Sequence, residues 1–177
     1  MSRNLVKGVV SLMCVTLALV VTAPSMRSQA QDTPQKLRVG VYDNRAIAMA
    51  YFHSAHNAFI AKRDEFQSAQ KAGDSTRIVE LNDWVKRFQR QIHFQGFCRA
   101  PVDDLLAEVR DGVAEVAKSH QLDLIGWYPD YASDNIEIVD ITGELVALFE
   151  PNPEKLNEIA NIKNIEPVAL CDISDNE

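Results

Sequence analysis

Residues 37–44 read Leu-Arg-Val-Gly-Val-Tyr-Asp-Asn, and this stretch decides how the chain begins to fold. Every second residue from Leu37 to Val41 is apolar, which is the period-two pattern of a strand with one buried face. Asp43 or Asn44 can then cap a helix, because a short polar side chain accepts hydrogen bonds from the unpaired N–H groups of the first turn. The sequence therefore predicts a strand that leads directly into a helix.

A long helical region follows this strand. Residues 45–72 contain no Pro and no Gly, and three Phe residues recur in them at intervals of seven, so we predict one continuous helix with an apolar seam. Gly73 suits the left-handed position that ends a helix. Apolar residues then return in 3-4-3-4 spacing from Ile78 to Ile92, which predicts a second helix packed against the first as an antiparallel hairpin.

Gly96 and Pro101 are predicted to interrupt the second arm of the hairpin. The rest of the chain is predicted to contain short helices and strands. We expect segments 37–43, 122–128 and 136–140 to form one small sheet, because each is too short to stand alone. Asp140 and Thr142 are predicted to act structurally, with Thr142 or a neighbour capping the helix that begins at Gly143. Further expected elements are helices at 102–120, 143–149 and 154–162 and an edge strand at 165–170. The predicted fold class is α+β, a helical hairpin projecting from a small sheet.

The first 30 residues have the architecture of a secretory signal peptide. Arg3 and Lys7 precede an uncharged apolar run at 8–21, and small residues lead up to Ala30, where signal peptidase would cleave. The run is too short for a comfortable membrane-spanning helix, although an uncleaved anchor is the alternative. We therefore expect a periplasmic protein without stable membrane insertion, beginning with a flexible lead-in at 31–36.

Charge and cysteine content narrow the possible partners. Cleavage at this position leaves 15 Lys and Arg against 25 Asp and Glu, a net charge of −10. Nucleic acid and anionic membranes reward clustered basic residues, so neither is expected as the main partner. In an oxidising compartment Cys98 and Cys171 can form a disulfide if their Cα atoms come within about 7 Å, and two separate buried thiols are the alternative.

The sequence contains no recognisable catalytic motif. It lacks a phosphate-binding glycine loop, a G-x-S-x-G turn and an H-E-x-x-H helix, and we predict neither enzymatic activity nor a cofactor. His53 and His56 lie three residues apart on one helical face, but two ligands do not make a metal site, so no metal is expected either.

Aromatic residues are the best candidates for contact with a partner. We expect Trp84, Phe88, Phe94 and Phe97 to line an apolar surface that contacts a client protein. Packing of these rings within the hairpin is the alternative.

Three stretches resemble the OmpH/Skp family of periplasmic chaperones. They are residues 37–43 entering a helix, the turn at 71–74, and residues 113–149, where Val-Asp-Ile-Thr at 139–142 precedes an apolar helix. The resemblance covers most of residues 37–149. It implies a homotrimer whose strands form a central body and whose helical arms, here at about 45–100, surround a cavity for unfolded outer-membrane proteins. Residues 150–177 would be a C-terminal extension.

These observations lead to three functional hypotheses. The first is an ATP-independent periplasmic holdase or envelope-biogenesis factor that binds unfolded outer-membrane proteins. The second is a non-catalytic structural or adaptor protein of the cell envelope, which the short arms and the acidic charge favour. The third is a small-ligand-binding periplasmic protein, because residues 37–45 also look like the first strand of solute-binding proteins.

Overall fold

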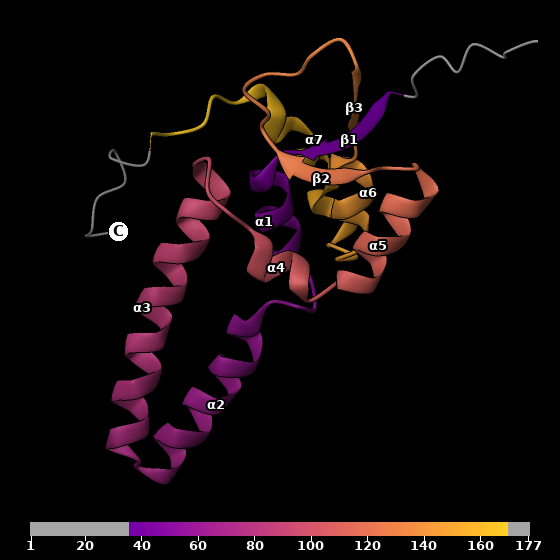
Figure 1. The fold of residues 1–177 in the computed structure, drawn as a ribbon. Helices are drawn as coiled ribbons and strands as arrows, with labels where there is room; N and C mark the ends of the chain where they lie inside the picture. The colour runs from indigo at the N-terminus through magenta and orange to yellow at the C-terminus, as the bar shows by residue number, and fades with distance from the viewer. Residues whose placement is uncertain (1–35, 170–177) are drawn as a thin grey trace, which may run out of the picture. The chain divides into compact units, whose positions relative to one another are not determined.

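The computed structural model of the chain describes residues 36–169 and has a mixed α+β fold (Figure 1). The predicted signal peptide, nearly all of the predicted lead-in and Cys171 lie outside the described residues. The strands are β1 (Leu37–Tyr42), β2 (Leu124–Trp127) and β3 (Ile136–Asp140). The helices are α1 (Asn44–Phe52), α2 (Ala58–Ala72), α3 (Ser75–Phe97), α4 (Asp103–Ala107), α5 (Arg110–Ser119), α6 (Thr142–Ala147) and α7 (Leu156–Asn161), with 3-10 turns at Pro153–Lys155 and Ile162–Asn164.

The three predicted strands pair in one parallel sheet with the order β2-β1-β3, which confirms that part of the prediction. Asp123 helps to set the register, because its backbone N–H donates to the Arg38 carbonyl at 2.8 Å and its carboxylate accepts from the Arg38 N–H at 2.8 Å. Parallel strands need long connections, and the whole run of helices from α1 to α5 supplies the connection between β1 and β2.

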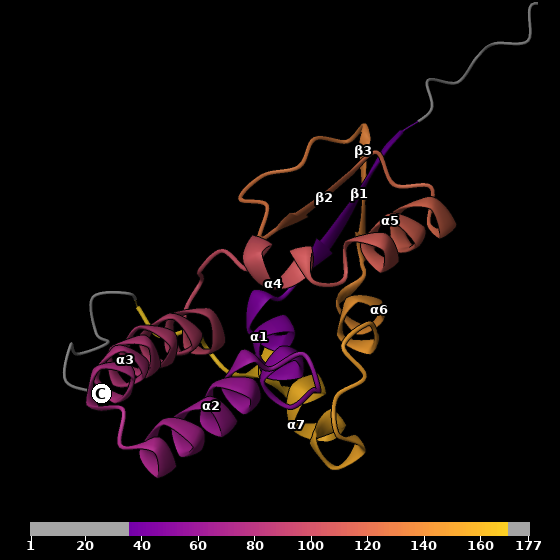
Figure 2. The same ribbon diagram turned by 90° about the horizontal axis from the view of Figure 1, so that it is seen from below.

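One face of the sheet packs on the hydrophobic core. Gly40 lies on this face, where a Cβ atom would come within 2.6 Å of Leu122 Cδ1 and 2.9 Å of Ile141 Cδ1. Figures 1 and 2 both place α5 and α6 on the same side of the sheet. The core beneath it is centred on Ile47, Ile141, Leu145 and Phe149, all essentially inaccessible to solvent.

The opposite face of the sheet is apolar and open to solvent. Val39 of β1 lies between Leu124 of β2 and Ile138 of β3. Leu37, Leu124 and Ile138 are 51%, 61% and 41% exposed. We call these three side chains the open sheet face. Parallel sheets are normally covered on both sides, so this face is unusual for a folded chain on its own.

The predicted continuous helix over 45–72 is wrong, because the chain leaves the helical path between α1 and α2. Ser54 Oγ donates to the Tyr51 carbonyl at 2.8 Å, and Asn57 Nδ2 donates to the Phe52 carbonyl at 2.8 Å. Asn57 Oδ1 then accepts from the N–H of Phe59 at 3.0 Å and caps α2. Short polar side chains have thus replaced backbone hydrogen bonds and re-aimed the helix.

The predicted helix over 102–120 is also divided, into α4 and α5, with the break at Glu108 and Val109. The break lets Leu105 enter the core while α5 packs on α6 through Gly112, where a Cβ atom would approach Leu148 Cδ2 to 2.6 Å. One straight helix could not make both contacts.

The segment after Phe149 packs on the rest of the fold. Ile159 of α7 and Ile162 join the same core as α1. The predicted edge strand at 165–170 is wrong over its described part: Val168 forms one isolated bridge with Cys98, and its N–H donates to the Phe97 carbonyl at 2.9 Å. Cys98 is fully buried, and its pairing with Cys171 stays a prediction.

A buried ion pair joins the end of β1 to α1. Asp43 caps α1, and its carboxylate accepts hydrogen bonds from the backbone N–H of Arg45 at 2.9 Å, from Arg45 Nε at 3.0 Å and from Arg45 Nη2 at 2.7 Å. Burial by itself would raise the pKa of Asp43, but the hydrogen bonds from Arg45 and the interaction with the Tyr128 hydroxyl outweigh it and hold that pKa below its ordinary value. Arg45 Nη1 also donates to the Ile165 carbonyl at 2.6 Å, which ties the C-terminal segment to this junction.

At the corner between β3 and α6, a neighbour of Thr142 contacts the start of the helix, which is one of the two predicted alternatives. No side chain caps α6 from its N-cap position, Ile141. Asp140 Oδ1 instead accepts from the Thr142 N–H at 2.9 Å, and the Thr142 hydroxyl accepts from the backbone N–H of Asp43 at 3.1 Å. Asp140 therefore accepts a hydrogen bond from the first turn of α6, while the Thr142 hydroxyl accepts one from the residue that follows β1.

Candidate functional site

An apolar groove runs between α1 and α3, with one wall extended by α2. It has a volume of about 400 Å³ and is lined by residues none of which is Asp, Glu, Lys or Arg. Phe52 of α1 and Phe97 of α3 lie on its rim and are 42% and 52% exposed. We call this feature the α1–α3 groove. Its lining residues are Ala48, Met49, Phe52, His53, Phe59, Val85, Phe88, Gln89, Ile92, His93, Gly96 and Phe97.

Capping and turn residues position the helices that form the groove. Gly73 adopts the left-handed conformation, with φ of 68°, and ends α2, after which Asp74 accepts from the Arg77 N–H at 3.0 Å and caps α3. Glu65 of α2 forms an ion pair with Arg77 of α3 and a second with Lys62 at 2.8 Å. Hydrogen bonds from Lys62 and Arg77 hold the pKa of Glu65 below its ordinary value. The two helices are thus joined by a short turn and by contacts near it.

Stacked aromatic rings continue from the groove along α2 and α3. The rings of Trp84 and Phe88 stack with centroids 4.9 Å apart, and Phe59 stacks on Phe88 at 6.4 Å. Lys62 Nζ lies 6.0 Å from the centre of the Trp84 ring. The three rings form a continuous apolar strip, and the Lys62 ammonium group lies near the Trp84 ring at one end of it.

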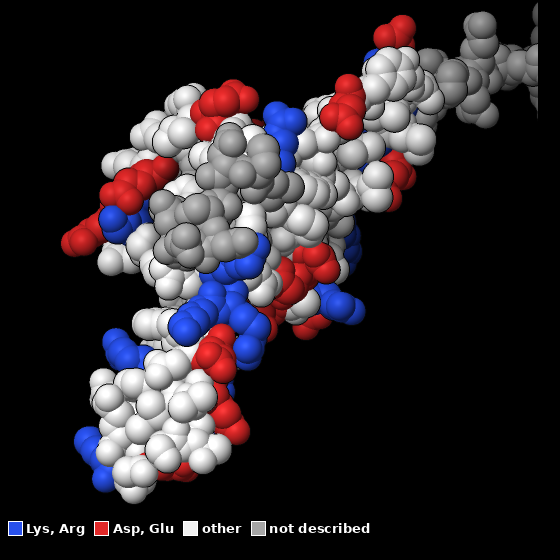
Figure 3. Space-filling model, turned by 90° about the vertical axis from the view of Figure 1, so that its left-hand side faces the viewer, with Lys and Arg blue, Asp and Glu red and all other residues white. Residues whose placement is uncertain are grey.

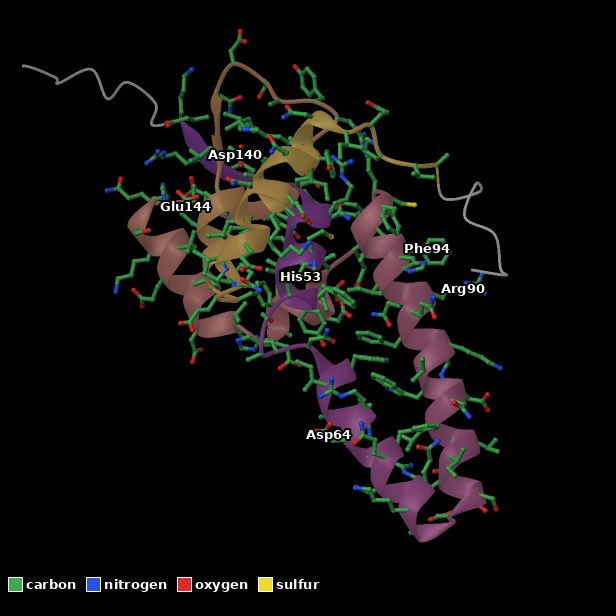
Figure 4. The ribbon with its side chains drawn as sticks, turned by 180° about the vertical axis from the view of Figure 1, so that it is seen from behind. His53, Asp64, Arg90, Phe94, Asp140 and Glu144 are labelled. Atoms are coloured by element: carbon green, nitrogen blue, oxygen red, sulfur yellow. The ribbon has the colours of Figure 1, made fainter. Side chains whose placement is uncertain are left out.

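The four predicted client-contacting residues do not share one surface. Phe88 and Phe97 line the α1–α3 groove, and Trp84 adjoins it through Phe88. Phe94 lies elsewhere, because it follows Ile92 by two positions and so projects about 200° around the helix. Figure 4 shows Phe94 and Arg90 pointing away from α2, with the Arg90 guanidinium 5.6 Å from the Phe94 ring.

The sequence prediction missed the wall that α1 contributes. Met49 and Phe52 line the groove, whereas the sequence pattern places Phe52 in the seam of a continuous helix and does not single out Met49. The signal that could have found this wall is the cluster Ser54 to Asn57, whose polar residues favour a helix end and a new cap.

The two histidines considered as metal ligands have different surroundings. His53 ends α1 at the groove (Figure 4), and burial together with the charge of Lys155 lowers its pKa against the opposing effect of Glu158. His56 packs edge-on against Phe149 with ring centroids 5.7 Å apart. Within residues 36–169 no group of three or more His, Cys, Asp or Glu side chains is placed to hold a metal ion.

Basic residues of α3 lie mainly on the side of the helix away from the α1–α3 groove, where Arg87 and Arg90 line a separate hollow with Phe94. Lys86, Arg87 and Arg90 of α3 are exposed, and Figure 3 shows Lys and Arg atoms gathered on the face turned toward the viewer. The lower part of that figure, which contains the end of α2 and α3 near Gly73, is mostly uncharged.

Comparison with known proteins leaves the site to be interpreted on its geometry alone. The chain matches no protein-family model, no curated protein and no solved structure. Among residues 36–169, none of the helices has the length and apolar character needed to cross a membrane.

Proposed function

We propose that this chain is an exported, ATP-independent holdase that binds apolar segments of unfolded outer-membrane proteins in the α1–α3 groove. The observation that carries the proposal is the uncharged lining of the groove together with the half-exposed rings of Phe52 and Phe97. Covering apolar surface contributes about 25 cal/mol per Å², without any requirement for a particular client sequence. A groove of this kind suits a protein that holds many different unfolded chains.

In this proposal α2 and α3 are the two arms of an antiparallel hairpin of the OmpH/Skp kind. The turn at Gly73, the Glu65–Arg77 ion pair and the stacking of Phe59 on Phe88 support that arrangement. The helices have 15 and 23 residues, or about 22 Å and 35 Å at 1.5 Å per residue. The groove lies at the base of the arms, so the client would be held between the arms and the body.

We further propose that the chain assembles as a homotrimer through the open sheet face. Leu37, Leu124 and Ile138 would be removed from water there by neighbouring copies. This explains why a parallel sheet leaves one apolar face uncovered within a single chain. The periplasmic location rests on the predicted signal peptide.

The decisive experiment is suppression of aggregation of a denatured outer-membrane protein. The variant Phe52→Asn/Phe97→Asn removes both rim rings, and Val79→Asn is the matched control because Val79 is an exposed α3 residue outside the groove. Losing about 1 kcal/mol of apolar contact per ring should weaken client binding about tenfold or more. Equal protection by the double variant and the control would refute the groove as the client site.

A non-catalytic adaptor of the cell envelope is the second candidate. The short arms and the acidic composition favour it, because a fixed partner needs less enclosed surface than an unfolded client. Failure to protect any denatured outer-membrane protein, combined with saturable binding of one folded envelope protein, would favour the adaptor over the holdase.

A further inference from the structure

A second hollow lies at the carboxyl ends of the three parallel strands and is separate from the α1–α3 groove. It has a volume of about 740 Å³. Tyr42 and Asp43 at the end of β1, Tyr128 after β2 and Asp140 at the end of β3 all line it. The opposite wall comes from α6, α7 and the segment that follows them. We call it the sheet-edge cavity. Parallel sheets characteristically bind small ligands at this edge, and the volume is in the usual range for such sites.

Tyr128 has three unusual features in this cavity. Its backbone has a φ of 43°, a left-handed conformation that is uncommon for a bulky residue and is found most often where a site requires it. Its hydroxyl oxygen is buried and makes no hydrogen bond of ordinary geometry within residues 36–169. Burial and the interaction of this hydroxyl with the Asp43 carboxylate raise the pKa of Tyr128 to about 12, so the hydroxyl keeps its proton at neutral pH.

Arg99 lies over the ring of Tyr128, with its guanidinium carbon 4.4 Å from the ring centre. Stacking occupies the flat face of a guanidinium and leaves the N–H groups at its edge available. Among the described residues no carboxylate forms an ion pair with Arg99, whereas Arg45 is engaged by Asp43 and by the Ile165 carbonyl. Arg99 is therefore better placed than Arg45 to receive an anionic group.

The remaining lining residues restrict the class of ligand. Three basic residues (Arg45, Arg99, Lys163) are balanced by three acidic ones (Asp43, Asp140, Glu166), which disfavours a multiply charged anion. Val146, Leu156 and Ile159 add an apolar patch to the same cavity. One negative charge and an apolar body match this combination.

We propose that the sheet-edge cavity binds a small amphipathic monocarboxylate, whose carboxylate is held by Arg99 lying on the Tyr128 ring and whose apolar body contacts Val146, Leu156 and Ile159. This class includes acylated amino acids with aliphatic side chains. The site is independent of the client groove, because the two share no lining residue.

Binding of N-acetylleucine to the full mature chain tests this site, with N-acetylleucine amide as the matched ligand that lacks the carboxylate. The fluorescence of Trp127 reports occupancy, since its ring lies 6.1 Å from that of Tyr128, and calorimetry provides an independent measurement. Saturable binding of the acid, with the amide at least about tenfold weaker, is the expected result.

Three variants locate the site. Arg99→Gln should weaken binding of the acid about tenfold, because it removes a hydrogen bond to a charged group. Tyr128→Leu should also weaken binding, because it removes the ring on which Arg99 lies. Arg87→Gln, at an exposed arginine outside this cavity, should leave binding unchanged. Circular dichroism and thermal unfolding establish that the variants are folded.

Three results would overturn the proposal. The first is the absence of saturable binding up to about 10 mM ligand. The second is equal binding of the acid and the amide, or binding that survives both substitutions. The third is binding that appears only after residues 170–177 are deleted, because the chain's own C-terminus would then be the natural occupant. The variant Phe52→Asn/Phe97→Asn should bind the acid normally, which separates this test from that of the holdase.

Discussion

Replacing Asp43 by Ala should be among the most damaging single changes in this fold. The side chains of Asp43 and Arg45 are only 10% and 4% exposed, and three hydrogen bonds from Arg45 reach the one carboxylate. The substitution leaves the Arg45 guanidinium buried without its counter-charge and removes the cap of α1. Breaking a buried pair on one side costs about 3–5 kcal/mol, and the lost cap, about 1 kcal/mol on its own, is one component of that cost.

Urea unfolding of the mature chain measures this loss directly. Glu137→Ala is the matched control, since it breaks the more exposed Arg38–Glu137 pair, with a 3.0 Å separation, and should cost only about 0.2–1 kcal/mol. The double variant Asp43→Ala/Arg45→Met should recover part of the stability, because it removes the uncompensated charge. A loss below about 1 kcal/mol for Asp43→Ala, equal to that of the control, would refute the reasoning.

The same carboxylate predicts a dependence of stability on pH. The folded-state pKa of Asp43 lies below its unfolded value of about 3.9, so its contribution is fully present above that pH and is lost as the pH falls through the folded-state pKa. The stability difference between the wild type and Asp43→Asn should therefore shrink on acidification below about pH 4. A difference that grows in this range would contradict the assigned direction of the shift.

Four further changes test other parts of the structure. Gly73→Ala places a side chain at a φ of 68° and should lower the free energy of unfolding by about 1–2 kcal/mol, as measured by urea unfolding; an unchanged value would mean that the turn relaxes. Gly40→Ala forces the side-chain ends of Leu122 and Ile141 to move and should lower the free energy of unfolding by about 1–3 kcal/mol in the same assay; an unchanged value would mean that the core has room for the added methyl group. Thr142→Ala removes the acceptor for an N–H at the end of β1 and should cost about 1 kcal/mol without changing client protection; loss of protection at full stability would assign Thr142 a direct role. Replacing residues 65–81 by a short Gly-Ser turn should preserve the oligomer mass and reduce client protection, and loss of the oligomer would place the arms in the assembly interface.

Local signals in the sequence predicted much of the secondary structure. The period-two alternation from Leu37 to Val41 predicted β1, and the short apolar segments at 122–128 and 136–140 predicted β2 and β3. Gly73 marked the end of the first arm of the hairpin, because a left-handed turn depends on neighbouring residues only.

The predictions were wrong where a periodic apolar pattern and local polar side chains favour different structures. Residues 45–72 have the periodicity of one helix, and Ser54 and Asn57 nevertheless divide it through hydrogen bonds that a periodic pattern does not reveal. Phe94 was grouped with Phe88 and Phe97 as an aromatic residue, although its angular position on α3 places it on another side. In the candidate site the sequence therefore identified the ring type and the wall from α3, and missed the wall from α1.

The sequence by itself determined strands β1, β2 and β3 and the turn at Gly73, because each depends on residues close together in the chain. The acidic composition is likewise a property of the sequence alone. Only the tertiary structure decided which surfaces remain open. The α1–α3 groove needs the break after Phe52, the sheet-edge cavity needs three strand ends brought together in one parallel sheet, and the open sheet face needs the helices to cover the other side. These features depend on contacts between residues 50 to 120 positions apart, as between Asn44 and Cys98 or Arg45 and Ile165, and local sequence patterns carry no record of such pairings.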